Sequence, residues 1–126
     1  MSSWVVNLTE EVEDWLLELS KNDPDSADQV AAAIDMLEAE GPALGRPLVD
    51  HVKGSNYRNM KELRPGSAGT NEIRILFAFD PQREAILLVA GDKSGNWRGW
   101  YETSILAADQ KFAEHLRELK GSSDGA

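Results

Sequence analysis

The chain has 126 residues, of which 41% are hydrophobic and 28% charged, and a formal net charge of −9 at pH 7. This length and composition predict one soluble globular domain, which we place at residues 1–120. The absence of cysteine excludes a disulfide framework, a thiol nucleophile and a cysteine-bound zinc ion. No apolar run reaches the roughly 18 residues that span a membrane, and the first residues lack the pattern of a secretory signal, so we expect a cytoplasmic protein.

Acidic and basic residues are distributed unevenly along the chain. Residues 1–52 hold twelve acidic and two basic side chains, whereas residues 53–101 hold five acidic and eight basic ones. The overall acidity argues against general nucleic-acid binding, because attraction to phosphates requires clustered lysine and arginine. The segment 53–101 is nevertheless mildly basic and can receive an anion locally.

The first forty residues predict a short strand and two helices. Residues 4–8 are β-branched and aromatic, as is typical of a strand. Thr9 is a candidate N-cap for the first helix, and Asp23 followed by Pro24 begins the second, which ends at Gly41. Each helix carries an apolar stripe at helical spacing, formed by Val12, Trp15, Leu16 and Leu19 in the first and by Val30, Ala33, Ile34 and Leu37 in the second.

The outward face of this predicted helical hairpin is acidic. Its carboxylates are those of Glu13, Asp14, Glu18, Asp28, Asp35 and Glu38. Such a run of charge is most often a solvated helix surface. The alternative is a docking surface for a basic partner, and the sequence alone does not separate the two.

The second half of the chain predicts three strands. Residues 42–56 contain several glycines and prolines and are predicted to form an ordered loop. Residues 57–63, 72–79 and 85–90 have the composition of strands, and turn residues lie between them. Alternation along 72–79 places four apolar side chains on one face, those of Ile73, Ile75, Phe77 and Phe79. The last of the three strands is apolar on both faces, as in the centre of a sheet.

A C-terminal helix is predicted from near Ser104, and residues 121–126 are expected to form a disordered tail. The order of elements is therefore strand, two helices, three strands and a helix (β-α-α-β-β-β-α). This order predicts an α+β fold with a small, mainly antiparallel sheet. We expect the N-terminal helical hairpin and the C-terminal helix to pack on one face of that sheet.

Motifs for metals and nucleotides are absent from the sequence. His51 and His115 are the only histidines, and they do not have the spacing of metal ligands. Neither a GxxxxGK[ST] nor a GxGxxG motif occurs, so no nucleotide cradle is indicated. We therefore expect no metal and no cofactor.

Basic residues lie on or just after the three later strands, namely Lys61, Arg64, Arg74 and Lys93. Because side chains of neighbouring antiparallel strands can converge on one face, we expect Lys61, Arg74 and Lys93 to meet. Arg74 interrupts an apolar strand and must either be paired or face a cleft. The alternative to a cleft is an ion pair with Glu62 or Glu72.

Two aromatic residues follow this basic segment. Trp97 could offer a stacking surface and Tyr101 a phenol to a functional site. The alternative is that they are aromatic lids over the edge of the sheet, which is the commoner role of such side chains. Their spacing in the sequence does not decide between these roles.

Three stretches carry a resemblance to a known family: KELRPG at residues 61–66, EIRILFAFDP at 72–81 and GDKSGNWRGWY at 91–101. Together they resemble the RelE/ParE superfamily of toxins, and more closely its HigB-like, phage-derived branch. The resemblance covers roughly residues 4–119, and its order of elements agrees with the predicted one. It implies a single RelE-like toxin domain.

The resemblance implies the toxin of a type II toxin–antitoxin system that cuts mRNA on the ribosome and so inhibits translation. In this metal-independent endoribonuclease chemistry, the 2′-hydroxyl of the RNA attacks the adjacent phosphate. The products carry a cyclic phosphate and a 5′-hydroxyl. The implied partners are a helix-turn-helix antitoxin, the ribosome and mRNA, with no membrane involved.

The same resemblance implies roles for individual residues. The implied catalytic residues are Lys61, Arg74, Lys93 and Tyr101. The implied substrate-binding residues are Arg58, Glu62, Arg64 and Trp97. Two alternatives stay open, a ParE-like toxin directed at gyrase and a catalytically silent member that mainly binds its antitoxin. The acidic surface favours these alternatives, whereas the basic residues with Tyr101 favour the nuclease.

Overall fold

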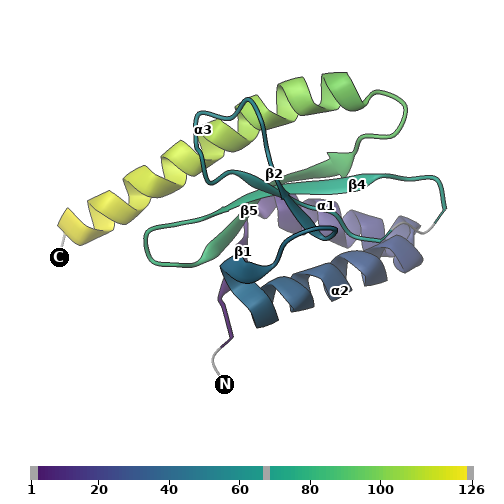
Figure 1. Ribbon diagram of the computed structural model, residues 1–126, viewed down its shortest axis with the longest axis horizontal. Coiled ribbons are helices and arrows are strands. Elements are labelled where there is room, and N and C mark those ends of the chain that lie inside the picture. The colour runs from purple at the N-terminus through teal and green to yellow at the C-terminus, as the bar shows by residue number, and fades with distance from the viewer. Residues whose placement is uncertain (1–2, 67–68, 125–126) are drawn as a thin grey trace.

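The computed structural model describes residues 3–66 and 69–124, and in these it contains a five-stranded sheet and three α-helices (Figure 1). The elements in chain order are β1 (Val6–Leu8), α1 (Glu10–Asn22), α2 (Pro24–Glu40), the 3₁₀ helix η1 (Gly41–Ala43), β2 (Val49–His51), β3 (Lys61–Leu63), β4 (Ile73–Phe79), β5 (Ala85–Asp92) and α3 (Trp97–Asp124). The strand order is β1-β5-β4-β3-β2, with β1 parallel to β5 and the other pairs antiparallel. The predicted α+β fold, with its helical hairpin and C-terminal helix, is confirmed.

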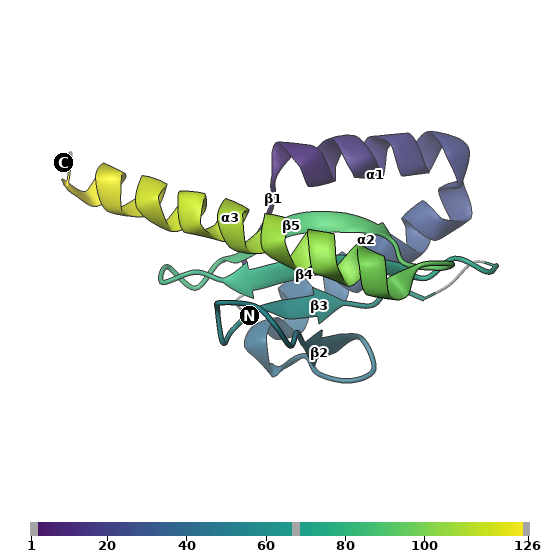
Figure 2. The same ribbon diagram turned by 90° about the horizontal axis from the view of Figure 1, so that it is seen from above.

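The helices cover both faces of the sheet (Figures 1 and 2). α1 and α2 pack on one face, where Val12 and Leu37 belong to the same buried cluster as Phe77 of β4. α3 packs on the opposite face, where Phe112 shares a second cluster with Leu76. The prediction that all helices pack on one face is wrong. β4 and β5 are apolar on both sides, so each side requires a helical layer to exclude water.

The helical hairpin begins and ends where the sequence predicts. Thr9 Oγ1 accepts a hydrogen bond from a backbone N–H of the first turn of α1 at 3.3 Å. Asp23 Oδ1 likewise accepts from the backbone N–H of Ser26 at 3.3 Å in α2. Gly41 ends α2 with a φ of 59°, and a side chain at this position would collide with the indole of Trp4.

The segment that was predicted to be a loop contains the edge strand β2. This strand pairs antiparallel with β3, and Asp50 lies opposite Glu62. The backbone N–H of His51 donates a hydrogen bond to Oδ1 of Asp50 at 2.8 Å. This donor of the edge strand is therefore occupied and does not pair with another strand. The strand predicted at 57–63 is shorter than expected, because it pairs only over Lys61–Leu63.

Helix α3 begins at Trp97, well before the start predicted near Ser104. Asn96 caps it: Oδ1 of Asn96 accepts from the N–H of Gly99 at 3.3 Å, and its carbonyl accepts from the N–H of Trp100 at 3.0 Å. The early start places the aromatic residues that follow residue 96 on a helix beside the sheet.

The far end of α3 extends past the sheet and reaches Asp124 (Figure 2). The helix therefore includes residues 121–124 of the predicted tail, while Gly125 and Ala126 lie outside the described residues. The placement of a single domain at residues 1–120 stays a prediction. Within the described ranges, no helix is both long and apolar enough to cross a membrane.

A β-bulge in β5 decides which residues face α3 near the end of that strand. Leu88 and Val89 both belong to the cluster under α3, so the alternation of faces shifts by one residue after them. Gly91 consequently lies opposite Arg74 on this face, directly under the indole of Trp100. The bulge thus brings the glycine, which has no side chain, to a position where the indole of Trp100 leaves no room for one.

Candidate active site

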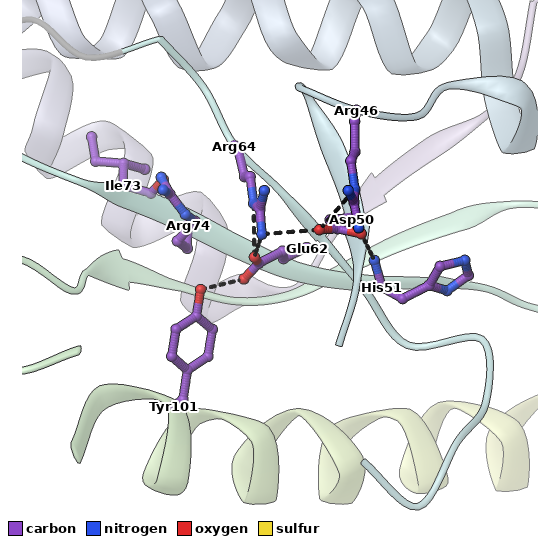
Figure 3. A network of polar contacts seen from close by, with 8 residues as sticks. All are labelled: Arg46, Asp50, His51, Glu62, Arg64, Ile73, Arg74 and Tyr101. Carbon is purple, nitrogen blue, oxygen red and sulfur yellow. Dashed lines mark hydrogen bonds and ion pairs between the residues drawn. The ribbon is translucent and has the colours of Figure 1, made fainter. Parts of the chain in front are cut away.

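Glu62 of β3 is the centre of a polar network on the α3 face of the sheet (Figure 3). Its side chain is buried, with the residue only 3% exposed. Its Oε2 accepts a hydrogen bond from the hydroxyl of Tyr101 at 2.6 Å, and its Oε1 accepts one from Nε of Arg64 at 2.8 Å. Nη2 of Arg64 lies 2.7 Å from the same Oε1. Both carboxylate oxygens are therefore occupied, and Glu62 connects β3 to α3.

The network continues from Arg64 to the edge of the sheet. Nη2 of Arg64 lies 3.2 Å from Oδ2 of Asp50, and Nε of Arg46 lies 3.3 Å from the same oxygen. The backbone N–H of His51, aided by the two arginines, lowers the pKa of Asp50 against the opposing effect of desolvation. Burial acts to lower the pKa of Arg64, but Glu62 and Asp50 outweigh it and raise that pKa. Arg64 is thus a cation held in place by two carboxylates.

Arg74 of β4 lies on the same face and has no carboxylate partner in the part of the chain that the structure describes. Its Nη1 donates to the carbonyl of Ile73 at 2.8 Å, while its buried Nε has no hydrogen-bond partner there (Figure 3). The sequence left open an ion pair of Arg74 with Glu62 or Glu72, and no such pair forms within the described part of the chain. A partly buried guanidinium of this kind can bind an anion from outside the chain.

Tyr101 lies where the basic side chains converge. Nζ of Lys93 is 5.5 Å from the centroid of the Tyr101 ring. Burial, and then the hydrogen bond to Glu62, raises the pKa of Tyr101 to about 12, whereas the charge of nearby Arg74 acts to lower it. Tyr101 is therefore a protonated phenol at neutral pH. The structure thus brings together five of the predicted site residues, namely Glu62, Arg64, Arg74, Lys93 and Tyr101.

Lys61 lies on the opposite face of the sheet from this cluster. Successive residues of a strand point to opposite faces, so Lys61 faces away from α3 when Glu62 faces toward it. Nζ of Lys61 is 5.7 Å from the ring centroid of Phe79, and Lys61 lines a separate cavity of about 310 Å³. The expected convergence of Lys61 with Arg74 and Lys93 is therefore wrong. Arg58 is exposed in the connection between β2 and β3 and does not reach the cluster either.

A cavity of about 520 Å³ lies between α3 and the β2–β3 edge of the sheet. The α3 side is formed by Trp97, Tyr101 and Ile105. The sheet side is formed by a mixed set of residues, namely Arg46, Asp50, His51, Val52, Lys53, Glu62 and Arg64. A second cavity of about 610 Å³ is lined by Arg64 and Arg74 among other residues. Arg64 therefore lies between the two cavities.

Sequence reasoning missed the contribution of Arg46 and Asp50 to this site. Both residues lie in the segment 42–56, which is predicted to be a loop because it contains several glycines and prolines. Residues 49–52 read Val-Asp-His-Val and do not alternate between apolar and polar side chains, so the sequence carried no strand signal at this position.

Two other buried aspartates hold α3 to its neighbours and lie outside the network. Oδ2 of Asp80 is 2.8 Å from Nε2 of His115, which also stacks on Phe112. Asp109 accepts hydrogen bonds from the side chain of Ser55 and from the following backbone N–H. Across residues 3–66 and 69–124, no group of three or more acidic or histidine side chains is arranged to hold a metal ion.

Comparison with known proteins identifies the family. The family described as "Phage derived protein Gp49-like (DUF891)" matches residues 14–113. Two similar proteins come from Mycobacterium tuberculosis (strain ATCC 25618 / H37Rv). "Putative toxin HigB2" is 55% identical over 117 residues, which are 93% of this chain and 56% of that protein. "Putative toxin HigB3" is 57% identical over 116 residues, which are 92% of this chain and 96% of that protein.

The chain thus spans about half the length of the first relative and nearly all of the second. The resemblance to the HigB-like, phage-derived branch, which the sequence motifs indicated, is confirmed. Because these matches cover most of the chain, the chain belongs to the Gp49-like family of phage-derived proteins.

Proposed function

We propose that this chain is the toxin of a type II toxin–antitoxin system and acts as a ribosome-dependent, metal-independent mRNA endoribonuclease that inhibits translation. The names of both relatives support a toxin. The observation that carries the nuclease is the partly buried guanidinium of Arg74, which has no carboxylate partner among the described residues and lies beside the phenol of Tyr101. A cation in this state beside a group that can transfer protons suits a phosphodiester substrate.

The scissile phosphate would lie between Arg74 and Arg64. Arg64 is already held by two carboxylates, so it would supply a fixed donor at the boundary of the two cavities. Arg74 would supply the charge that the phosphate neutralises, and its unpaired Nε–H would gain an acceptor. Lys93, beside the ring of Tyr101, would stabilise the extra negative charge of the transition state.

Cleavage requires a base for the 2′-hydroxyl and an acid for the leaving oxygen. The hydroxyl of Tyr101 donates a hydrogen bond to Oε2 of Glu62. The phenol oxygen can therefore accept the proton of the 2′-hydroxyl while the phenol proton transfers to Oε2 of Glu62. The 2′-oxygen then forms a bond to phosphorus, and the bond from phosphorus to the 5′-oxygen breaks. The ammonium of Lys93 protonates that leaving oxygen. The products are a 2′,3′-cyclic phosphate and a 5′-hydroxyl. Glu62 then releases its extra proton to solvent, and Lys93 takes one back from solvent.

The charge of the chain supports dependence on the ribosome. With a formal net charge of −9, the protein as a whole repels RNA, so free transcripts would bind weakly. A ribosome would overcome this by presenting the mRNA to the basic cluster. A helix-turn-helix antitoxin would neutralise the toxin in the cytoplasm, and the acidic hairpin of α1 and α2 would lie outside the catalytic face.

The test is to express the chain in a bacterial host and map the 5′ ends of cellular transcripts. We expect cuts in translated mRNA that follow the reading frame and disappear in Arg74→Ala and Lys93→Ala variants. The control is Arg117→Ala, because Arg117 is exposed on α3 away from the cluster. Cuts that persist unchanged in Arg74→Ala would contradict the proposed role of the network.

The acidity of the chain also supports a second candidate, a ParE-like toxin directed at gyrase. A protein target does not require a basic surface, whereas RNA does. In that case the transcripts of the expressing cells would be unchanged and DNA breaks linked to gyrase would accumulate. A catalytically silent member that only binds its antitoxin would produce neither effect and would not slow growth.

A further inference from the structure

We propose that the cavity between α3 and the β2–β3 edge binds one unpaired base of the RNA next to the scissile phosphate, with Trp97 as its stacking surface. This inference rests on the proposed function, because it assigns a substrate subsite to the same active site. It concerns a separate part of that site, namely the side chains that would hold the base, whereas the proposed function concerns those that would hold the phosphate.

The wall formed by α3 is aromatic and apolar. Trp97, Tyr101 and Ile105 are spaced four residues apart, so they form one stripe on the helix, and all three line the cavity. Val52 adds an apolar side chain on the sheet side. The volume of about 520 Å³ lies within the usual range for a small-ligand site.

Trp97 is more exposed than a structural tryptophan would be. It is 57% exposed, whereas Trp100 of the same helix packs over Gly91 and against the Tyr101 ring at 5.1 Å. Tyr101 meets Trp97 edge-on at a centroid distance of 6.3 Å, and Arg98 lies 5.8 Å from the Trp97 ring. These contacts hold the indole in the lining of the cavity and leave more than half of Trp97 exposed. A base that stacks on it would bury this apolar surface.

The charged side chains of the cavity suit a nucleotide. Its two carboxylates, Asp50 and Glu62, are both held by arginines, so neither faces a ligand as an unpaired anion. Three basic residues, Arg46, Lys53 and Arg64, line the same space. The cavity is therefore locally positive in a chain whose net charge is negative.

The cavity is continuous with the residues that would hold the phosphate. Arg64 lines both this cavity and the one that contains Arg74, while Tyr101 lines the first. A nucleotide whose phosphate contacts Arg64 and Arg74 would therefore have its base within reach of Trp97. A base in a duplex is stacked on both sides and cannot enter, so the subsite would select single-stranded RNA.

Binding of a short RNA to the purified full chain tests this subsite. The probe is a hexanucleotide of mixed sequence with 2′-O-methyl groups throughout, which cannot be cut because no 2′-hydroxyl is free. Loss of one stacked base weakens binding by about tenfold or more, so we expect that loss in Trp97→Ala and a smaller one in Trp97→Phe. Leu106→Ala is the matched control, because Leu106 is a 59% exposed apolar residue of α3 that does not line the cavity.

A second set of probes shows whether Trp97 contacts a base. In each probe one of the central nucleotides is abasic. One abasic position should weaken binding to the unmodified chain as much as Trp97→Ala does, and should cause no further loss in the Trp97→Ala variant, because both changes remove the same contact. Equal binding of abasic and complete probes, equal affinities of Trp97→Ala and Leu106→Ala, or no binding of the complete probe would each overturn the subsite.

The binding assay also separates this inference from the proposed function. Trp97-dependent binding by a chain that leaves mRNA intact would keep the base subsite and refute the nuclease. Cleavage that depends on Arg74, together with binding indifferent to Trp97, would keep the nuclease and refute the subsite.

Discussion

The hydroxyl of Tyr101 donates to Oε2 of Glu62 at 2.6 Å, and this hydrogen bond joins the first turns of α3 to the short strand β3. Glu62 also holds Arg64 through its other oxygen. One buried carboxylate therefore fixes both the phenol and a guanidinium of the candidate active site.

Replacement of Glu62 should destabilise the protein. Glu62→Ala leaves the guanidinium of Arg64 and the phenol of Tyr101 without their buried partner, and we expect the free energy of unfolding to fall by about 2–3 kcal/mol. The side chain of Arg64 is 34% exposed, so water compensates part of the loss. Urea denaturation measures the change. Glu118→Ala on the exposed side of α3 is the control and should change stability by less than about 0.5 kcal/mol.

Arg64 and Arg74 should respond differently to substitution. Arg74→Ala removes no ion pair among the described residues, so stability should change by less than about 1 kcal/mol while RNA cleavage falls at least about 100-fold. Arg64→Ala should impair cleavage and also reduce stability, because it leaves Asp50 and Glu62 unpaired. Thermal unfolding and a cleavage assay on the same samples compare the two. Equal destabilisation by both substitutions would contradict the assignment of Arg74 as a cation reserved for a ligand.

Lys61 should be dispensable for cleavage, although the resemblance implied a catalytic role for it. It lies on the opposite face of the sheet from Tyr101, so Lys61→Ala should change the cleavage rate by less than about twofold, within the small effect of a surface substitution. Lys93→Ala is the comparison, because Lys93 lies beside the Tyr101 ring and its loss should slow cleavage strongly. A large loss in Lys61→Ala with normal stability would mean that the site extends to both faces.

The raised pKa of Tyr101 predicts a dependence of stability on alkaline pH. The pKa of Tyr101 rises from 10.0 to about 12 on folding, so the folded chain holds this proton more tightly than the unfolded chain. The resulting contribution to stability is complete below pH 10 and is lost as the pH rises from 10 to about 12. The difference in the free energy of unfolding between the unmodified chain and Tyr101→Phe should therefore be constant below pH 10. Above pH 10 the unmodified chain should lose stability relative to Tyr101→Phe. A difference that stays constant up to pH 12 would contradict the burial of Tyr101 together with its bond to Glu62.

A methyl group at Gly91 should displace the start of α3. The Cβ of an alanine there would lie 2.4 Å from Nε1 of Trp100, whose ring packs against Tyr101. We expect Gly91→Ala to reduce the free energy of unfolding by about 1–3 kcal/mol and to alter the near-UV circular dichroism of the aromatic residues. Gly45→Ala is the matched control, because nothing lies within 4 Å of the added Cβ.

The long, capped elements could be predicted from the sequence, whereas the short edge strand could not. The helical hairpin has caps at Thr9 and Asp23 and apolar stripes at helical spacing, and both helices form where these signals predict. The strand β2 has only three residues between glycine- and proline-rich stretches, so local composition indicated a loop. The early start of α3 depends on the cap at Asn96, whereas the apolar pattern of the sequence placed the start near Ser104.

The candidate site could be predicted only in part, because strand register is not visible in a single sequence. Strand parity alone separates Lys61 from its neighbour Glu62, but which of them faces Arg74 depends on how β3 pairs with β4. The bulge in β5 shifts the faces again before Lys93. The residue types of the site were therefore evident, while the face on which each one lies required the structure.

Cleavage of a defined mRNA by the purified chain tests the nuclease most directly. The chain is added to ribosomes that translate this mRNA, and the ends of the fragments are identified chemically. We predict fragments with 2′,3′-cyclic phosphate and 5′-hydroxyl ends, formed only when ribosomes are present and absent with Arg74→Ala. An mRNA that stays intact on translating ribosomes, while the same preparation of the chain blocks gyrase, would contradict the account.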